Sequence, residues 1–296
     1  MLEDTIRRFT DSAWSGPPDV APTQAVEALL EGGRLLWFPD MPFALKTEER
    51  RLLDPAVGDA KAKNISLRAG TDELRGASAN AADASALRAM VMRFRDQAQA
   101  LLDRLFPHYR GHLAAGNTSF RPYAVVGRRR SWRQDDSRLH VDAFPSNPMR
   151  GQRLLRVFSN INPNGEPRVW RVGEPFEQFA RRHVAKISRP LAGSAALMYR
   201  LRVTKRERSE YDHLMLRLHD RAKADAVWQR DAPQLSQPFP PGSTWVVFSD
   251  QVLHAAMSGQ FMMEQTFMLP SVNLLTPQTS PLHVLERLTG RQLLVR

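Results

Sequence analysis

The spacing of apolar residues changes along the chain, and the change divides it near residue 116. Before that point the strongest pattern has the period of a helix and stops at Pro107. Its members are Leu87, Met90, Val91, Phe94, Ala98, Leu101, Leu102 and Leu105. The earlier run "GGRLLWFPD" predicts a short buried strand that ends at Pro39. We therefore expect residues 1–115 to be mostly helical and to support the rest.

After residue 116 the apolar residues fall in short runs typical of β-strands, separated by Gly, Pro and Asn turns. A stretch at about 174–230 interrupts them, and its stripe of Leu214, Met215, Leu218 and Ala222 predicts helix. The β-type runs are "SFRPYAVVG", "SRLHVDAF", "QRLLRVFSNIN", "PRVWRVG", "GSTWVVFSD", "QVLHAAMSG" and "QFMMEQTFMLPSVNLL".

Short strands with tight turns between them predict antiparallel sheets that pack on each other. We expect an α+β fold in a single domain, residues 1–296, with a double-stranded β-helix (jelly-roll, cupin-like) core at 116–275. N-terminal helices within 1–115 would precede this core and a helical insertion near 174–230 would interrupt it. A C-terminal helix at 276–296 would follow it.

Composition limits the chemistry and the partners. The chain has no cysteine, which excludes thiolate nucleophiles and Cys-ligated metals and leaves histidine and carboxylate as metal ligands. It has no apolar run of membrane-spanning length and no signal-peptide pattern, so we expect a soluble, cytoplasmic protein without a transmembrane segment. The net charge of +11 predicts an anionic partner, whether nucleic acid, lipid headgroup or phosphorylated sugar.

One stretch, "DDSRLHVDAFPS", carries two potential metal ligands. On a strand His140 and Asp142 would point to the same face, while Val141 packs behind them. A third ligand must come from another strand, and His254 in "FSDQVLHAAMSG" is the candidate. Two imidazoles and one carboxylate, with three positions open, form the ligand set of non-haem Fe(II) oxygenases. The alternative is that His140 and Asp142 only form hydrogen bonds within the sheet.

Three open positions on Fe(II) would accommodate a chelating 2-oxoacid and O2, and the far carboxylate of 2-oxoglutarate would then need a cation. The chain has no basic residue between His254 and Phe267. Strand alternation favours Arg156 over Arg153 for this role. Further candidates depend on a strand register in which a slip of one residue reverses the side chain. They are Asn160 and Gln265 for the co-substrate, and Tyr123, Trp170 and Arg171 for the substrate. Arg128, in the basic cluster "GRRRSWR", is a further candidate for the substrate.

Two longer blocks carry a family resemblance. They are "DDSRLHVDAFPSNPMRGQRLLRVFSNINPNGEPRVWRVGEPFE" at 135–177 and "FPPGSTWVVFSDQVLHAAMSGQ" at 239–260. With these blocks the chain resembles the Kdo 3-hydroxylases, Fe(II)/2-oxoglutarate-dependent dioxygenases that act on the 3-deoxy-D-manno-octulosonic acid (Kdo) of lipopolysaccharide. The resemblance implies that His140, Asp142 and His254 bind iron. It also implies hydroxylation of Kdo at C3 to give Ko, with conversion of 2-oxoglutarate to succinate and CO2.

The resemblance also gives the basic residues a role. Kdo-containing lipid A carries carboxylates and phosphates, so Arg128–Arg130 would bind the sugar acid or contact the inner face of the inner membrane peripherally. Two rival functions remain at this point. One is the same oxygenase chemistry on nucleic acid, for which Trp132 is the only stacking hint. The other is a non-enzymatic jelly-roll module that binds carbohydrate.

Overall fold

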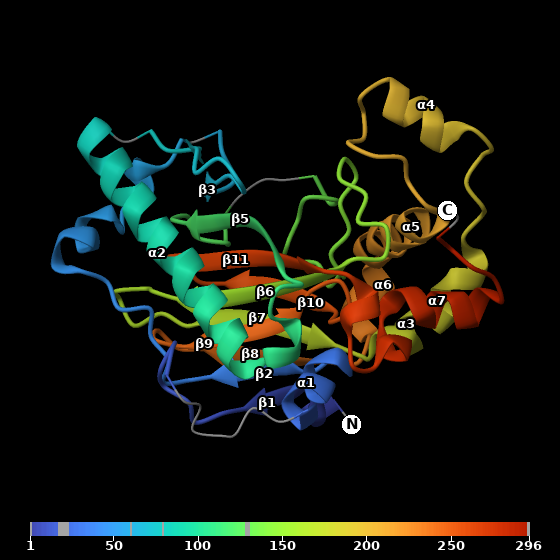
Figure 1. The fold of residues 1–296 in the computed structure, drawn as a ribbon, viewed down its shortest axis with the longest axis horizontal. Helices are drawn as coiled ribbons and strands as arrows, with labels where there is room; N and C mark the ends of the chain where they lie inside the picture. Colours follow the sequence, from blue (N-terminus) through green and yellow to red (C-terminus); the bar gives the residue numbers. More distant parts are fainter. Residues whose placement is uncertain (1, 17–23, 60, 79, 128–130, 295–296) are drawn as a thin grey trace.

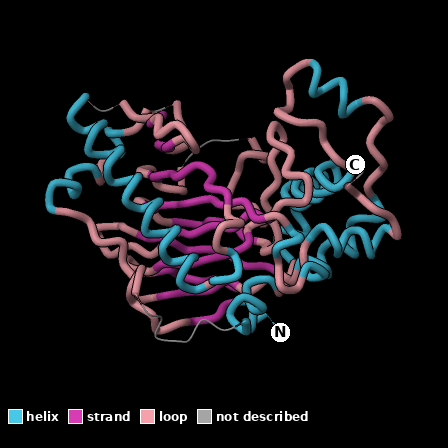
Figure 2. The backbone as a smooth tube through the Cα atoms, in the orientation of Figure 1, coloured by secondary structure: helices cyan, strands magenta, loops and turns pink. Residues whose placement is uncertain are grey.

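Two β-sheets form the centre of the protein (Figures 1 and 2). The computed structural model describes residues 2–16, 24–59, 61–78, 80–127 and 131–294. The larger sheet has eight strands in the order β1-β2-β9-β6-β11-β5-β3-β4, and the smaller has three in the order β10-β7-β8. The strands are β1 (Ile6–Arg8), β2 (Leu35–Phe38), β3 (Ile65–Leu67), β4 (Leu74–Arg75), β5 (Ala114–Arg121), β6 (Arg153–Asn160), β7 (Arg168–Gly173), β8 (Gln234–Phe239), β9 (Thr244–Phe248), β10 (His254–Ser258) and β11 (Met262–Leu269).

Strand pairing is antiparallel in the described residues, except that β1 and β2 run parallel. The two sheets are held together by an aromatic cluster between them. The ring centroids of Phe158 and Trp170 lie 5.0 Å apart, and those of Phe239 and Trp245 lie 4.2 Å apart. The expected antiparallel sheets are therefore present, within a mixed fold of helices and strands.

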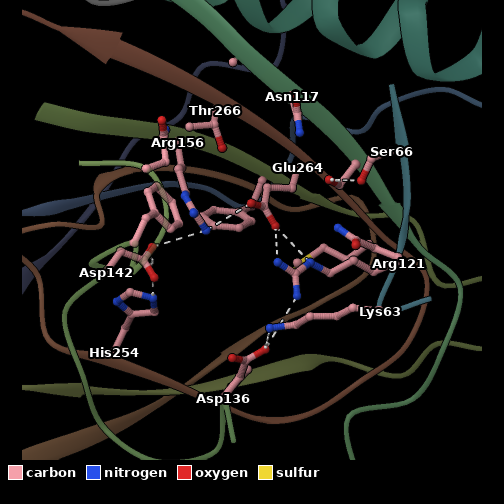
Figure 3. A pocket seen from close by; sticks show the side chains of 18 of the residues that line it. Lys63, Ser66, Asn117, Arg121, Asp136, Asp142, Arg156, His254, Glu264 and Thr266 are labelled. Atoms are coloured by element: carbon pink, nitrogen blue, oxygen red, sulfur yellow. Dashed lines mark hydrogen bonds and ion pairs between the residues drawn. The ribbon is translucent and has the colours of Figure 1, made fainter. Parts of the chain in front are cut away.

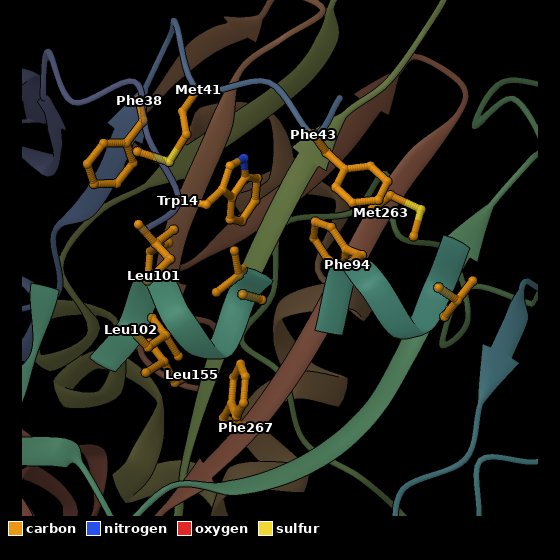
Figure 4. Close-up of a cluster of buried hydrophobic side chains, with 14 of the residues drawn as sticks. Trp14, Phe38, Met41, Phe43, Phe94, Leu101, Leu102, Leu155, Met263 and Phe267 are labelled. Carbon is orange, nitrogen blue, oxygen red and sulfur yellow. The ribbon is translucent and has the colours of Figure 1, made fainter. Parts of the chain in front are cut away.

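The long helix α2 (Ala81–Leu105) covers the other face of the larger sheet (Figure 1). It begins at the Asn80 cap, whose side chain accepts a hydrogen bond from the Asp83 N–H, and it ends at Phe106, before Pro107. The predicted apolar stripe is confirmed, because all eight of its members are buried. Figure 4 shows part of this layer, in which Phe94, Leu101 and Leu102 lie near Leu155, Met263 and Phe267 of the sheet.

Strand alternation decides which side chains face the space between the sheets. On β6, Leu155 and Val157 pack in the α2 layer, whereas Phe158 belongs to the cluster between the sheets. On β11, Met263 belongs to the α2 layer and Met262 to the cluster between the sheets. Even-numbered residues of both strands therefore face the smaller sheet.

Most of the other helices pack together beyond one end of the sheets (Figure 1). Phe179, Leu218, Trp228 and Leu285 belong to their shared core. No helix among the described residues is long and apolar enough to cross a membrane. The helices of this group are α3 (Phe176–His183), α5 (Glu210–Ala224), α6 (Ala226–Asp231) and α7 (Pro281–Thr289). Helix α4 (Ser194–Arg200) projects away from them, and α1 (Gln24–Glu31) lies beside the larger sheet.

Two local predictions need correction. The run "SRLHVDAF" forms no regular strand: His140 makes a single bridge to His254, and the residues after it are irregular. The run "SFRPYAVVG" continues as strand only to Arg121, since Pro122 has no N–H to donate to a neighbouring strand. The backbone at 140–142 is nevertheless fixed, because the Asp142 N–H donates to the Ser249 carbonyl at 2.9 Å.

Replacing Phe94 with Ala tests the layer between α2 and the sheet. Phe94 is fully buried and lies edge-to-face against Trp14 and Phe43, so its loss leaves a cavity. We expect Phe94→Ala to lower the free energy of unfolding by about 3–5 kcal/mol in urea denaturation. Arg88→Ala, at an exposed position of the same helix, is the control and should change it by less than about 0.5 kcal/mol. Equal stabilities of the two variants would contradict this packing.

Candidate active site

A backbone bridge brings the two predicted histidines side by side. The His140 N–H donates to the His254 carbonyl at 3.0 Å, and the His254 N–H donates to the His140 carbonyl at 2.9 Å. Their imidazole centroids are therefore only 4.8 Å apart. Asp142 completes the group, with carboxylate oxygens 3.7 Å from His140 Nε2 and 4.0 Å from His254 Nε2. One ligand atom from each residue lies within 4.8 Å of the others, close enough to share one metal ion.

Both imidazoles are oriented by backbone carbonyls. His140 Nδ1 lies 2.7 Å from the Arg138 carbonyl oxygen, and His254 Nδ1 lies 2.8 Å from the Val252 carbonyl oxygen. A carbonyl oxygen only accepts, so each Nδ1 carries the proton and each Nε2 keeps its lone pair. Hydrogen bonding of the second ring nitrogen in this way is the usual arrangement of metal-binding histidine.

Burial and charge keep the three groups in the protonation states that a metal needs. Burial lowers the pKa of both His140 and His254, so the imidazoles stay neutral. Burial opposes ionisation of Asp142, but the adjacent Arg156 guanidinium outweighs it and holds the pKa of Asp142 below its ordinary value. Neutral imidazoles and an ionised carboxylate are the forms that bind divalent metal.

Packing behind the three groups fixes their positions. The Trp170 ring stacks on His254, with centroids 5.0 Å apart and planes 22° from parallel. Val141 is fully buried in the core formed by the helices. Its side chain therefore points away from those of His140 and Asp142. The predicted arrangement, with His140 and Asp142 on one side and Val141 behind, is therefore present without a regular strand.

The group lies in a cavity of about 660 Å³ that opens between the sheets (Figure 3). Its lining is rich in charge, with six cationic and three acidic side chains. Besides the two histidines and Trp170, it includes Phe144, Phe158 and Thr266. The cationic residues are Lys63, Arg68, Arg121, Arg156, Arg168 and Lys205, and the acidic ones are Asp136, Asp142 and Glu264.

Alternating charges run from the metal-ligand candidates along the cavity (Figure 3). Arg156 Nη1 lies 3.2 Å from Asp142 Oδ2 and 3.0 Å from Glu264 Oε1. Arg121 Nε donates to Glu264 Oε2 at 2.8 Å, and its Nη1 lies 3.7 Å from Asp136 Oδ2. Burial would raise the pKa of Glu264, but Arg121 and Arg156 lower it, so the carboxylate stays ionised.

Arg156 faces the cavity, as strand alternation predicts. Arg153 lies on the opposite face of β6, where its Nε donates to Asp250 at 2.7 Å. The Arg156 contacts with carboxylates are made through Nη1, while its Nε is buried without a hydrogen-bond partner among the described residues. A buried guanidinium with an unused donor is suited to a further anion.

Arg168, which was not among the predicted site residues, also lines the cavity. Its Nη1 donates to the Gly259 carbonyl at 3.0 Å, but its Nε has no hydrogen-bond partner and no carboxylate of the described residues pairs with it. Burial and the nearby Arg121 lower its pKa to about 9, so it remains cationic at neutral pH. The signal was available, because Arg168 is two residues before Trp170 on β7 and so shares its face.

Two predicted co-substrate residues do not line the cavity. The Asn160 amide donates to the carbonyls of Glu166 and Phe239, so it holds a loop instead. Gln265 points toward the α2 side of β11, where its side chain accepts from the Thr118 hydroxyl. Its neighbours Glu264 and Thr266 face the cavity, so the prediction for Gln265 was wrong by one residue of register.

The predicted substrate residues have mixed outcomes. Trp170 lines the cavity. Tyr123 does not, since its hydroxyl donates to the Asp59 carbonyl and it borders a separate small cavity of about 50 Å³. Arg171 does not line the cavity either. It follows Trp170 on β7, so its side chain points to the opposite face, and its Nη2 donates to the Ser137 carbonyl. Arg128, with the rest of Arg128–Arg130, lies outside the described residues.

Two imidazoles and a carboxylate at the base of a cavity between two sheets have the donor set of mononuclear non-haem iron oxygenases. A family model described as 3-deoxy-D-manno-oct-2-ulosonic acid (Kdo) hydroxylase matches residues 14–292. The chain therefore belongs to the Kdo hydroxylase family. No curated protein matches the chain.

Solved structures of a Kdo hydroxylase, KdoO, are similar to this chain over nearly its whole length. The complex of KdoO with α-ketoglutarate and Fe(III) is 43% identical, with a TM-score of 0.91, and covers 98% of this chain and 97% of KdoO. The cobalt(II) complex is 44% identical, with a TM-score of 0.93 and the same coverage. KdoO is described as a non-haem Fe(II) α-ketoglutarate-dependent dioxygenase, and a further complex contains succinate and Fe(III).

The protonation states of the two histidines give a pH prediction. In the metal-free protein we expect both imidazoles to titrate below pH 6.5, the ordinary pKa, because burial disfavours their charged forms. Long-range ¹⁵N–¹H NMR spectra of the imidazoles would also report Nδ1-protonated tautomers at neutral pH. Titration at or above pH 6.5, or proton occupancy of Nε2, would contradict the described geometry.

Proposed function

We propose that His140, Asp142 and His254 bind Fe(II), and that the protein hydroxylates Kdo at C3 in Kdo-containing lipid A to give Ko. 2-Oxoglutarate would be converted to succinate and CO2. The observation that carries this proposal is the convergence of two Nε2 atoms and one carboxylate in the cavity of a chain that belongs to the Kdo hydroxylase family. The metal and α-ketoglutarate complexes of KdoO support it. We also interpret the two facing sheets as a double-stranded β-helix.

The residues present fit an iron ion. Nitrogen and oxygen donors are the ligands available in this chain without cysteine, and they are the donors that non-haem Fe(II) sites use. Bound Fe(II), with 2-oxoglutarate and O2, would supply the oxidising chemistry that side chains cannot. The protein would hold the ligands in their binding forms through the carbonyls of Arg138 and Val252. Trp170 would shield His254 from water.

Arg156 is our proposed partner for the distal carboxylate of 2-oxoglutarate. Its guanidinium lies next to Asp142, and its buried Nε lacks a hydrogen-bond partner. Glu264 forms an ion pair with this guanidinium, and Arg121 donates a hydrogen bond to Glu264. The Arg156 guanidinium is therefore oriented before 2-oxoglutarate binds. Thr266 pairs with Arg156 across the two strands and lines the same cavity, which places a hydroxyl near the guanidinium.

Arg168 is our proposed partner for the carboxylate of Kdo. A buried guanidinium that no carboxylate contacts directly is costly unless an anion binds to it. Arg168, whose Nε has no hydrogen-bond partner among the described residues, lines the same cavity as the proposed iron ligands. Lys63 and Arg121 also line this cavity and add positive charge beside Asp136. The cavity would then hold two carboxylates, one from each substrate, on two different arginines.

Contact with a membrane follows from a lipid-linked substrate. We propose that the protein contacts the anionic inner face of the inner membrane peripherally, and its net charge of +11 supports this. Cytoplasmic location stays a prediction.

Incubation with Kdo-lipid A tests the proposed function. With Fe(II), 2-oxoglutarate and O2, mass spectrometry should detect a gain of one oxygen in the sugar and an equivalent amount of succinate. His140→Ala should abolish metal binding and turnover, because a two-ligand site does not hold the ion. His108→Ala, at an exposed position outside the cavity, should keep both. Failure of the wild-type protein to modify the sugar, or persistent turnover in His140→Ala, would reject the assignment.

Two arginine variants separate the proposed carboxylate sites. Arg156→Gln should weaken 2-oxoglutarate binding by about 10–100-fold, the value of a charge-assisted hydrogen bond, as measured by calorimetry with Co(II) in the site. Arg168→Gln should leave that binding within about twofold and raise KM for the Kdo substrate by a similar factor of about 10–100. The reverse pattern, or equal effects of both variants on both ligands, would show that the two roles are misassigned.

A further inference from the structure

Exposed apolar side chains concentrate in one segment of the chain. Eight large hydrophobic residues of the described part are exposed, and five of them fall between residues 191 and 203. Exposed apolar residues scattered singly are normal, but a group of this kind marks an interaction surface. The five are Leu191 (83% exposed), Leu197 (58%), Tyr199 (48%), Leu201 (65%) and Val203 (55%).

These residues lie on and around α4, which projects from the body of the protein (Figure 1). We call residues 189–206 the α4 projection. Helix α4 has seven residues and none of them is buried. A helix this short is marginal in water without tertiary packing. Among the described residues, the rest of the protein therefore supplies no apolar surface that covers α4.

The charge of the α4 projection is of one sign. It contains five Lys and Arg residues and no Asp or Glu. Arg189, Arg200 and Arg202 are exposed, and no carboxylate of the described residues forms a salt bridge with them. Apolar side chains interspersed with unpaired arginines are typical of segments that lie in the interface of an anionic bilayer. The same charge argues against a second copy as the partner, because two such surfaces would repel each other.

The base of the α4 projection reaches the proposed active site. Thr204 is buried, and the Lys205 N–H donates to the Ser146 carbonyl at 2.9 Å. The Lys205 side chain lines the same cavity as His140 and His254. A partner surface bound by the α4 projection would therefore lie close to the cavity that we propose binds the substrate.

We propose that the α4 projection is a membrane-docking element that inserts its apolar side chains at the boundary between headgroups and acyl chains of an anionic bilayer. Its arginines would contact lipid phosphates, at a gain of about fivefold in binding per residue. This inference deepens the proposed membrane contact, but binding to lipid requires neither iron nor Kdo. It can therefore fail or succeed independently of the hydroxylase assignment.

Vesicle co-sedimentation tests the proposal with the full-length protein and no substrate. Wild-type protein should bind phosphatidylglycerol-containing vesicles and bind pure phosphatidylcholine vesicles at least about tenfold more weakly. Leu197→Glu/Leu201→Glu should lower binding to the anionic vesicles by at least about tenfold, because two apolar side chains no longer insert. Arg200→Glu/Arg202→Glu should lower it by a similar factor.

Matched controls use sites away from the α4 projection. Val227→Glu/Val272→Glu changes two valines that are at least as exposed as Leu197. Arg50→Glu/Arg88→Glu reverses the charge of two exposed arginines. Both controls should bind vesicles within about threefold of wild type, because bulk charge has only a modest effect without insertion. If the wild type does not bind anionic vesicles, or if the controls lose as much binding as the α4 variants, the proposal is overturned. It is also overturned if size-exclusion chromatography shows a dimer that Leu197→Glu/Leu201→Glu abolishes, since the partner is then a second copy.

Discussion

The reciprocal hydrogen bonds between His140 and His254 are the constraint on which the site depends. Residues more than a hundred positions apart are thereby set opposite each other, so their side chains emerge together on one side of the bridge. The carbonyls of Arg138 and Val252 then fix the tautomers. Backbone geometry thus places two Nε2 lone pairs beside a carboxylate.

The charged lining of the cavity follows from the same architecture. Ionised Asp142 and Glu264 are stable in a buried setting because Arg156 lies between them. Arg121 continues the alternation from Glu264 to Asp136. Arg168 differs from these, because no carboxylate of the described residues lies within salt-bridge distance of it, and Asp136 and Glu264 act on it only from farther away. Its place in the cavity is the structural basis for expecting an acidic substrate.

Sequence periodicity predicted the features that depend on local geometry. The stripe of α2 required only the helical repeat, and the convergence of His140 with Asp142 required only the two-residue repeat of extended chain. Gln265 was misplaced because a register slip of one residue cannot be detected without the neighbouring strand. Lys63 was missed for a different reason, because its place in the cavity depends on which distant segments the sheets bring together, and no local pattern encodes that. The face of Arg168 could have been inferred from its two-residue spacing to Trp170, but the absence of a carboxylate paired with it in the described residues could not.

Anomalous diffraction from crystals grown with Co(II) tests the central claim most directly. A single peak should lie about 2.0–2.2 Å from His140 Nε2, His254 Nε2 and an Asp142 carboxylate oxygen. Both Nδ1 atoms should keep their carbonyl partners when the ion is bound. Absence of metal at this position, or a metal held by other side chains, would contradict the account of the site.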